Sequence, residues 1–179
     1  AIQINPNSAE AYYNLGLAFE KLGESQKAIS CYKKAIQIRP NYAKVYNNLG
    51  LIFKEINEIE KAKSFFEDAI RNDLNYSAAH NNLGTILHSL GEFKKTIDCY
   101  ERSLEINPNF SNAHYNLGVV FYELAEYEKA KACYEQAIKI NPNFANSYYN
   151  LGNVFEELDE LQNAITCYKK AIQIQPNHI

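Results

Sequence analysis

The feature that most constrains this sequence is a repeat of 34 residues. The stretch from Ala9 to Tyr42 returns four more times along the chain, so that Tyr12 corresponds to Tyr46, His80, His114 and Tyr148. Every copy holds a Leu-Gly pair, at Leu15-Gly16, Leu49-Gly50, Leu83-Gly84, Leu117-Gly118 and Leu151-Gly152. Self-similarity at a fixed period of this length indicates a solenoid, in which each repeat buries its apolar face against its neighbours.

The repeat divides the chain into five complete units, at residues 9–42, 43–76, 77–110, 111–144 and 145–178. Residues 1–8 (AIQINPNS) resemble the end of the first unit, and we interpret them as the tail of a preceding repeat. The last helix offers Ile165, Tyr168 and Ile172 with nothing after it, although a terminal repeat normally carries a polar outer face. We therefore expect a single array excised from a longer protein, whose uncapped ends self-associate at high concentration.

Each unit predicts two helices joined by a short turn, and such helices run antiparallel. The first extends from about Ala9 to Leu22 and stops at Gly23, which suits the left-handed conformation of a helix C-terminus. The second ends before Pro40, which has no N–H to donate. Small Gly16 should let the two helices approach closely. Both helices carry apolar residues at helical spacing, namely Tyr12, Leu15, Phe19, Ala28, Ile29, Tyr32, Ala35 and Ile36.

Composition and charge limit the classes of partner. The 179 residues carry a net charge of -3 at pH 7 and have a pI near 5.8, whereas a nucleic-acid binder usually presents a basic face. No stretch approaches the ~20 apolar residues of a membrane span, and residues 1–8 lack the basic flank and apolar run of a signal peptide. We expect neither nucleic acid nor a membrane as partner, and a cytoplasmic location.

The four cysteines, Cys31, Cys99, Cys133 and Cys167, occupy one position of the unit. Equivalent positions in successive repeats lie at least one helix apart, roughly 8–10 Å, which exceeds the ~7 Å limit between the Cα atoms of a disulfide. The sequence contains no CxxC motif and no Cys/His cluster at metal spacing. We interpret the cysteines as small, half-buried hydrophobic residues in a reducing compartment.

Residues suited to catalysis or metal binding are scattered. His80 and His114 occupy the first-helix position that holds Tyr elsewhere, and we interpret them as packed, hydrogen-bonded side chains rather than metal ligands. No nucleophile elbow, phosphate-binding glycine loop or Ser/His/Asp group can be assembled. The carboxylates are spread over exposed helix faces. The sequence therefore predicts no enzyme activity, no cofactor and no metal site.

The order of the apolar residues resembles the tetratricopeptide repeat (TPR) family. The residues that carry the resemblance are Tyr12, Leu15, Gly16, Phe19, Ala28, Tyr32 and Pro40, with Tyr in place of the usual first Trp. The resemblance covers nearly the whole chain, so that the five units would be TPR 1 to TPR 5. It implies an all-α solenoid, a right-handed superhelix of antiparallel helix pairs whose first helices line a concave groove.

The sixth residue of every unit is asparagine: Asn14, Asn48, Asn82, Asn116 and Asn150. We call these five residues the asparagine ladder. Asparagine is a mediocre helix former, so five copies inside helices need a reason. The structural explanation is an amide that bonds a neighbouring helix or water. The functional explanation, which we favour, is that a row of carboxamides pairs with the N–H and C=O groups of an extended peptide.

We expect further peptide contacts from residues on the same helix face, namely Tyr13, Asn47, Asn81, Tyr115, Tyr122, Tyr149 and Asn153. The N-terminal part of this face has mixed charge. The C-terminal part is aromatic and acidic, with Glu123, Glu156 and Glu157, and would favour a ligand that carries Lys or Arg. A merely solvated charged face explains the same residues equally well.

The primary prediction is a protein–protein interaction module that holds an extended peptide in the groove through the asparagine ladder. The repeated Asn-Leu-Gly also resembles the TPR arm of O-linked N-acetylglucosamine transferases, which implies a substrate-recruiting arm of a glycosyltransferase or other enzyme, with its catalytic domain outside this sequence. Peroxisomal-import receptors of the same family likewise use groove asparagines. A third alternative is a structural scaffold that assembles by end-to-end stacking. The basic clamp with which some TPR proteins hold a terminal carboxylate is absent.

Overall fold

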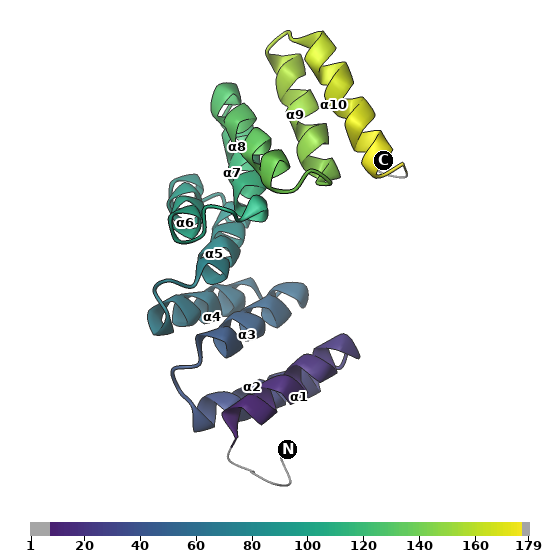
Figure 1. Cartoon of the computed structure of the whole chain (residues 1–179). Coiled ribbons are helices and arrows are strands. Elements are labelled where there is room, and N and C mark those ends of the chain that lie inside the picture. Colours follow the sequence, from purple (N-terminus) through teal and green to yellow (C-terminus); the bar gives the residue numbers. More distant parts are fainter. Residues whose placement is uncertain (1–7, 177–179) are drawn as a thin grey trace. The chain divides into compact units, whose positions relative to one another are not determined.

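The computed structural model describes residues 8–176. Residues 1–7 of the predicted preceding repeat, and residues 177–179, lie outside the described part. Within residues 8–176 the chain forms α-helices joined by short turns, with no strand (Figure 1). The helices are α1 (Ala9–Lys21), α2 (Ser25–Ile38), α3 (Ala43–Glu55), α4 (Ile59–Asn72), α5 (Ser77–Ser89), α6 (Phe93–Ile106), α7 (Ser111–Glu123), α8 (Tyr127–Ile140), α9 (Ala145–Glu157) and α10 (Leu161–Ile174).

The helices belong to two compact units, Ala1–Ile86 and Leu87–Ile179, and the division falls inside α5. In the first unit, α1 packs on α2, α2 on α3 and α3 on α4. In the second unit, α6 packs on α7, and the same succession continues through α8 and α9 to α10. Within each compact unit, these helices therefore pack mainly on their neighbours in the sequence, which is the organisation of an all-α solenoid.

The two helices of a repeat meet at the Leu-Gly pair. A Cβ atom on Gly16 would lie 2.3 Å from the ring of Tyr32, and one on Gly50 would lie 2.5 Å from the ring of Phe66. Gly118 and Gly152 meet the rings of the equivalent tyrosines in the same way. No other residue leaves room for an aromatic ring to lie across the first helix, which confirms the predicted close approach.

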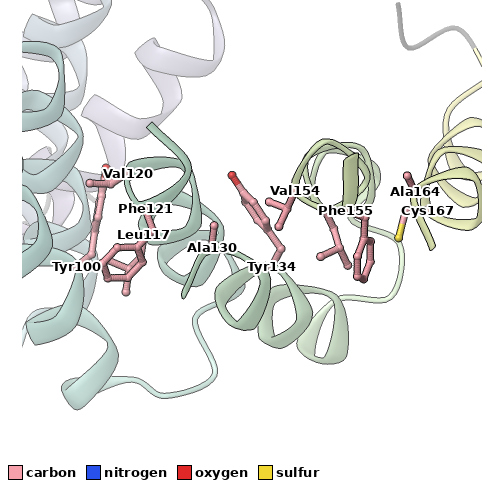
Figure 2. Close-up of a cluster of buried hydrophobic side chains, with 11 residues drawn as sticks. Tyr100, Leu117, Val120, Phe121, Ala130, Tyr134, Val154, Phe155, Ala164 and Cys167 are labelled. Atoms are coloured by element: carbon pink, nitrogen blue, oxygen red, sulfur yellow. The ribbon is translucent and has the colours of Figure 1, made fainter. Parts of the chain in front are cut away.

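In the first four repeats, the large ring of the second helix is buried in the core. Tyr32 is fully buried in the first unit and packs with Val45 and Leu49 of the following helix. Tyr134 is its counterpart in the second unit, 1% exposed, and lies between Ala130 and Val154 (Figure 2). Burial of such a ring removes about 150–250 Å² from water, so these residues dominate the packing between repeats.

The turn inside each repeat contains a residue in the left-handed conformation. Gly23 and Gly91 have φ of 73°, as predicted for the stop of the first helix, and the same position holds Asn57 at 61°, Ala125 at 56° and Asp159 at 59°. Glycine adopts this region freely and asparagine with little cost, whereas alanine is strained there. The backbone of the turn is therefore retained even where the sequence does not favour it.

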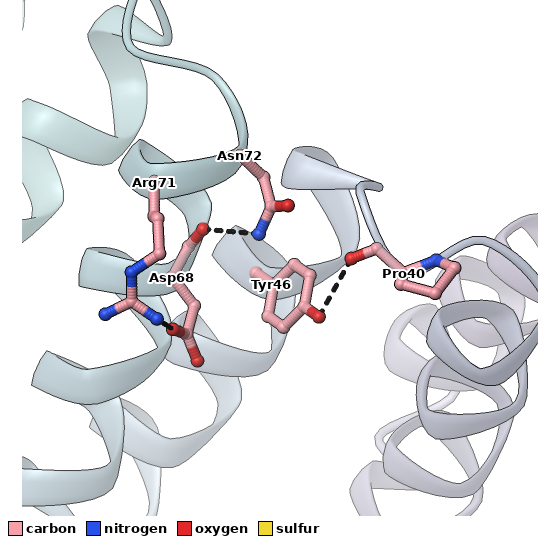
Figure 3. Close-up of polar contacts among 5 residues, drawn as sticks. All are labelled: Pro40, Tyr46, Asp68, Arg71 and Asn72. Carbon is pink, nitrogen blue, oxygen red and sulfur yellow. Dashed lines mark hydrogen bonds and ion pairs between the residues drawn. The ribbon is translucent and has the colours of Figure 1, made fainter.

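The first-helix position shared by Tyr and His fastens the loop that precedes the helix. The hydroxyl group of Tyr46 donates to the carbonyl oxygen of Pro40 at 2.9 Å (Figure 3). His80 and His114 make the same contact through Nε2, at 3.1 and 3.0 Å from a carbonyl oxygen six residues earlier. Because a carbonyl oxygen only accepts, the ring nitrogen must donate. Hydrogen-bonded histidines were predicted, and the structure confirms them.

The cysteines lie within or beside the core. Cys31 and Cys167 are buried, Cys99 and Cys133 are half-buried, and all four are free thiols. Burial, with a smaller contribution from the carboxylate of Glu101, raises the pKa of Cys133 to about 12. This thiol is therefore protonated at neutral pH and packs as a small hydrophobic residue, which agrees with the sequence interpretation.

Candidate functional site

The asparagine ladder is best defined at Asn48, which lies in the compact unit Ala1–Ile86. Its Nδ2 atom donates to the hydroxyl oxygen of Tyr32 at 3.1 Å, and that hydroxyl group donates in turn to the carboxylate of Glu20. A phenol has one hydrogen, and Glu20 takes it, so Asn48 must donate rather than accept. This chain of hydrogen bonds fixes the orientation of the amide: its N–H points to α2 and its Oδ1 is left as an acceptor.

Asn82 faces a different neighbour, because Phe66 stands where Tyr32 stands in the first repeat and has no hydroxyl group. The Nδ2 atom of Asn82 instead donates to Oδ1 of Asn47 at 2.9 Å. Asn47 and Asn81 are both buried, at 4% and 7% exposed, and Asn81 lies 3.5 Å from the amide oxygen of Asn82. These two predicted site residues therefore support the ladder from within the core.

In the compact unit Leu87–Ile179, Asn150 of the fifth repeat has the same arrangement as Asn48. Its Nδ2 atom donates to the hydroxyl oxygens of Tyr115 and Tyr134, at 3.3 and 3.4 Å. Both amide hydrogens are used, and the carbonyl oxygen remains. Of the other ladder residues, Asn14 is exposed and Asn116 is half-buried.

The predicted groove tyrosines form stacks with neighbouring rings. The ring of Tyr13 lies 6.0 Å from that of Tyr32 and 5.3 Å from that of Tyr42, and Arg39 lies 4.6 Å over the outer face of Tyr42. In the second unit, Tyr115 lies 5.0 Å from Phe144. In both repeats, the aromatic residue just before the first helix of the following repeat packs on the tyrosine, Tyr42 on Tyr13 and Phe144 on Tyr115.

The fifth repeat holds the same pair of tyrosines in a more exposed setting. Tyr149 is 48% exposed and lies 5.6 Å from the ring of Tyr168. The hydroxyl group of Tyr168 lies 2.8 Å from both Oδ1 of Asn153 and Oε2 of Glu156. These residues line a pocket of about 430 Å³, which we call the fifth-repeat pocket; its lining is Tyr149, Asn153, Glu156, Tyr168, Ala171, Ile172 and Pro176.

The charged residue that lines the described part of the fifth-repeat pocket is an acid, Glu156. Burial and the neighbouring carboxylate of Glu156 raise the pKa of Tyr168. Tyr122, another predicted site residue, packs 5.6 Å from Tyr127, and its pKa is raised by burial and by the charges of Glu157 and Glu156. No Lys or Arg lines the described part of the pocket.

The sequence prediction identified Tyr149, Asn153 and Glu156 on one helix face but not the contribution of α10. Tyr168 belongs to the apolar stripe of a second helix, where a ring normally lies in the core. The helical spacing of this stripe therefore predicted a packing role for Tyr168 and no contact with a ligand. Its exposure depends on what packs against α10, which is a tertiary property.

Two other features are absent from residues 8–176. No three His, Cys, Asp or Glu side chains come together there as a metal site. None of the described helices combines the length and the hydropathy that crossing a membrane requires.

Comparison with known families gives the repeat its name. The tetratricopeptide repeat matches residues 9–42, 77–110, 111–144 and 145–178, and a second description of the same repeat matches residues 31–64. The chain belongs to the tetratricopeptide repeat family. TPR arrays of this kind are protein-interaction modules and typically have no catalytic role. No curated protein matches the sequence.

Solved structures similar to this TPR chain cover nearly all of it. MamA is 27% identical with a TM-score of 0.78, covering 90% of this chain and 94% of its own. YrrB, described as a TPR protein with an unusual peptide-binding site, is 25% identical with a TM-score of 0.75, covering 99% of this chain and 91% of its own. Pseudomonas aeruginosa PilF has a TM-score of 0.88 at 23% identity, covering 99% and 81%, and shares the fold.

Proposed function

We propose that this TPR chain binds an extended peptide of a partner protein, and that the asparagine ladder holds the backbone of that peptide. The observation that carries the proposal is the fixed orientation of the Asn48 and Asn150 amides. Tyrosine hydroxyl oxygens accept their N–H groups, so each amide presents its carbonyl oxygen. An oriented acceptor can receive a backbone N–H without first losing side-chain entropy.

This arrangement makes a definite requirement of the ligand. The ladder residues of each unit would accept hydrogen bonds from backbone N–H groups, and recognition would be largely independent of the ligand's side chains. A neutral hydrogen bond contributes only about 0.5–1.5 kcal/mol, so one amide is not enough and several must act together. Tyr13, Tyr115, Tyr122 and Tyr149 would add aromatic contacts beside the backbone.

The peptide class of ligand is also supported by similarity to YrrB, whose description includes a peptide-binding site. The two explanations given for the ladder are compatible in this proposal. The amide N–H groups serve the structure by bonding neighbouring helices, and the amide oxygens serve the ligand.

The scaffold alternative has an observation of its own. Ile165 and Ile172 on α10 are 44% and 60% exposed and form an apolar face on the helix. A second copy stacking on this face would bury them. Sedimentation over a range of concentrations, with Ile165→Lys, Ile172→Lys beside the wild type, tests this alternative: association that persists in the variant excludes the α10 face.

The main experiment alters the ligand backbone and the ladder separately. An extended-peptide library is screened first, and a binder is then resynthesised with single ester bonds in place of amides, which removes one N–H at a time. We expect each ester opposite a ladder residue to weaken binding by about threefold to tenfold, equivalent to 0.5–1.5 kcal/mol. Asn48→Ala, Asn82→Ala and Asn150→Ala together should weaken binding at least tenfold.

The matched control is Asn72→Ala with Asn163→Ala, two exposed asparagines on the second helices α4 and α10. This pair should leave binding unchanged. Circular dichroism verifies that both variants remain helical, and the ester series needs no variant at all. Ester positions without effect, or a ladder variant that binds like the control, would exclude backbone recognition by the ladder.

A further inference from the structure

The third repeat contains a pair of rings beside a carboxylate, where its first helix α5 ends. The rings of His88 and Phe93 lie 5.9 Å apart with an interplanar angle of 61°. The Nε2 atom of His88 lies 2.8 Å from Oε2 of Glu123, in the last turn of the following first helix α7. An ionised carboxylate only accepts, so the ring nitrogen donates, and a histidine can also carry the opposite charge. This cluster therefore supplies a partner for its own carboxylate.

The fourth repeat has the same geometry with a tyrosine in place of the histidine. The rings of Tyr122 and Tyr127 lie 5.6 Å apart at an angle of 59°, and Glu157 of α9 stands at the position of Glu123. Burial, followed by the charge of Glu157 and a hydrogen bond to its carboxylate, raises the pKa of Tyr122 and of Tyr127. Both phenols therefore donate to Glu157 but leave its charge in place. We call Tyr122, Tyr127 and Glu157 the tyrosine–glutamate cluster.

The backbone adds to the negative charge of this cluster. The C-terminus of a helix carries about half a negative charge, which basic residues in its last turn offset. The first helices α1, α3 and α5 each have such a residue, namely Lys21, Lys54 and His88. The last turns of α7 and α9, both inside the described part of the chain, have none and contain glutamates instead. A cation supplied by a ligand would offset the carboxylate of Glu157 and these helix ends together.

A hollow beside Tyr127 leaves room for a side chain. Its volume is about 380 Å³, and its lining is Ala125, Glu126, Tyr127, Glu128, Lys129 and Leu158. Lys129 is already paired with Glu126, so the remaining charge of the lining is that of Glu128. Leu158 provides an apolar wall, against which the aliphatic stem of a lysine or arginine can pack.

The third repeat shows that a following repeat leaves such a hollow open. Phe93, the counterpart of Tyr127, lines a hollow of about 320 Å³ together with Glu92, Lys94 and Lys95, although two more repeats follow it in the same compact unit. Two lysines and one glutamate line that hollow, whereas the lining in the fourth repeat has two glutamates and one lysine. The two neighbouring repeats therefore differ in the charge that they would attract.

We propose that the tyrosine–glutamate cluster binds a basic side chain, lysine or arginine, of the partner protein, with the cation paired with Glu157 and lying against the tyrosine rings. A cation is attracted to the face of such a ring as well as to a carboxylate. This proposal rests on the proposed function, because the basic residue would belong to the peptide bound by the first helices. It gives that peptide a side-chain preference that ladder contacts do not supply, and it places the preference in the fourth repeat.

The test uses probes without an extended backbone. The Nα-acetyl methylamides of arginine and lysine are titrated into the ¹⁵N-labelled chain, beside their neutral analogues, which contain citrulline and Nε-acetyl-lysine. We expect shift changes concentrated at Tyr122, Tyr127 and Glu157, and an affinity of the better cation at least tenfold above that of its neutral analogue. Glu157→Gln should reduce binding of that cation about tenfold without altering binding of the neutral analogue.

A second variant gives the fourth repeat the histidine of the third. At about pH 5.5 an imidazole is largely protonated, whereas at about pH 8 it is neutral. We expect Tyr122→His to bind the cationic probe at least about fivefold more weakly than the wild type at the lower pH, and within about twofold of it at the higher pH. Glu157 is retained in this variant, so the loss would come from a cation supplied by the chain itself.

Glu105→Gln is the matched control, because Glu105 is an exposed carboxylate on the second helix α6, paired with Arg102. It should leave the affinity for the cationic probes unchanged. Equal binding of the cations and their neutral analogues, no binding of either, or an unaffected Glu157→Gln variant would overturn the proposal. Circular dichroism verifies that each variant remains helical.

The two proposals fail separately. Probe binding that survives in the Asn48→Ala, Asn82→Ala, Asn150→Ala variant, together with loss of library binding, supports both. Probe binding without any library binding supports the cation site and excludes the ladder. Library binding with no preference for a basic residue at any peptide position, and no response to the cationic probes, excludes the cation site alone.

Discussion

The first and fifth repeats carry the same cluster of side chains and place it in different surroundings. The cluster consists of Tyr13, Glu20 and Tyr32 in the first repeat and of Tyr149, Glu156 and Tyr168 in the fifth. In the first repeat, Tyr42 packs on the outer tyrosine and Asn48 donates to the inner one. In the fifth repeat, the equivalent side chains line a pocket of about 430 Å³.

This difference shows that the role of a repeat residue depends on what packs against the second helix. Tyr32 is 0% exposed and is part of the core, while Tyr168 is half-buried. The three residues are of the same type in both clusters, and the fifth repeat has Asn153 where the first has Leu17, so their energetics should differ through this neighbour and through the cover. Substitutions made in parallel in both repeats test that statement.

The largest expected difference comes from the glycine beneath the inner tyrosine. A Cβ atom would lie 2.3 Å from Tyr32 in Gly16→Ala and 2.4 Å from Tyr168 in Gly152→Ala. The ring of Tyr32 has no free space, so we expect Gly16→Ala to cost about 2–3 kcal/mol of unfolding free energy. The ring of Tyr168 can shift into the pocket, which should limit the cost of Gly152→Ala to about 1 kcal/mol.

Urea unfolding measures both variants, and hydrogen exchange in α1–α2 and α9–α10 assigns the loss to the altered repeat, because repeat arrays need not unfold in one step. An alanine in a helix without such crowding would stabilise by about 0.5–1 kcal/mol relative to glycine. Equal losses in the two repeats would mean that the pocket does not relieve the ring.

The next difference concerns the tyrosine hydroxyl group. Tyr32→Phe removes the partner of both Glu20 and Asn48, so we expect a loss of about 1–2 kcal/mol. Tyr168→Phe leaves Asn153 and Glu156 accessible to water and should cost less than about 0.5 kcal/mol. Thermal unfolding monitored by circular dichroism compares the two.

The second repeat supplies the control for this comparison, because it already contains Phe66 in the tyrosine position. There the ladder amide of Asn82 turns to Asn47 instead. If Asn48 can make the same turn, Tyr32→Phe will be nearly neutral, and the hydroxyl group will not be what fixes the ladder.

Much of the fold follows from the sequence because the repeat itself is diagnostic. The period, the helix pairs, the left-handed Gly23 and the close approach at Gly16 were predicted from residue type and spacing, and the structure has all of them. Each depends on local conformation or on contacts between sequence neighbours. Such contacts recur in every repeat, so one unit predicts the next.

The site was harder to predict because it depends on differences between repeats. A histidine ring nitrogen and a tyrosine hydroxyl group can each donate to the carbonyl oxygen of the loop before a first helix. The exchange of Tyr for His between repeats could therefore be understood from the chemistry of the two side chains. The partner of a ladder amide was not interpretable in this way. It changes from Tyr32 for Asn48 to Asn47 for Asn82, because Phe66 on the preceding helix has no hydroxyl group. Direct peptide contact by the ladder stays a prediction.

A smaller effect should appear at the turn between the two helices. Gly23 has φ of 73° and Ala125 has φ of 56° at the same position of the repeat. Left-handed conformation costs a residue with a Cβ atom roughly 1–2 kcal/mol. We therefore expect Gly23→Ala to destabilise by about 1 kcal/mol and Ala125→Gly to stabilise by up to about 1 kcal/mol, the gain being limited by glycine's greater freedom in the unfolded chain. Urea midpoints that move in the same direction for both would contradict this.

The smallest effect is a pH dependence that comes from Glu20 in the cluster of the first repeat. Burial raises the pKa of Glu20 above 4.5, and the nearby charge of Glu55 adds to the rise, although the hydrogen bond from Tyr32 opposes it. A carboxyl group with a raised pKa in the folded chain favours folding in its protonated form, so its contribution is fully present below pH 4.5 and is lost as the pH rises through the folded value.

Glu20→Gln should therefore stabilise the chain at pH 7, by less than about 1 kcal/mol because solvent screens the site. The gain should disappear at pH 4, where Glu20 itself is protonated. Melting temperatures at the two pH values measure this, with Glu105→Gln as the charge-matched control. A gain that is the same at both pH values would show that Gln stabilises the folded chain by packing. Burial of the Glu20 charge would then not be what destabilises the cluster of the first repeat at pH 7.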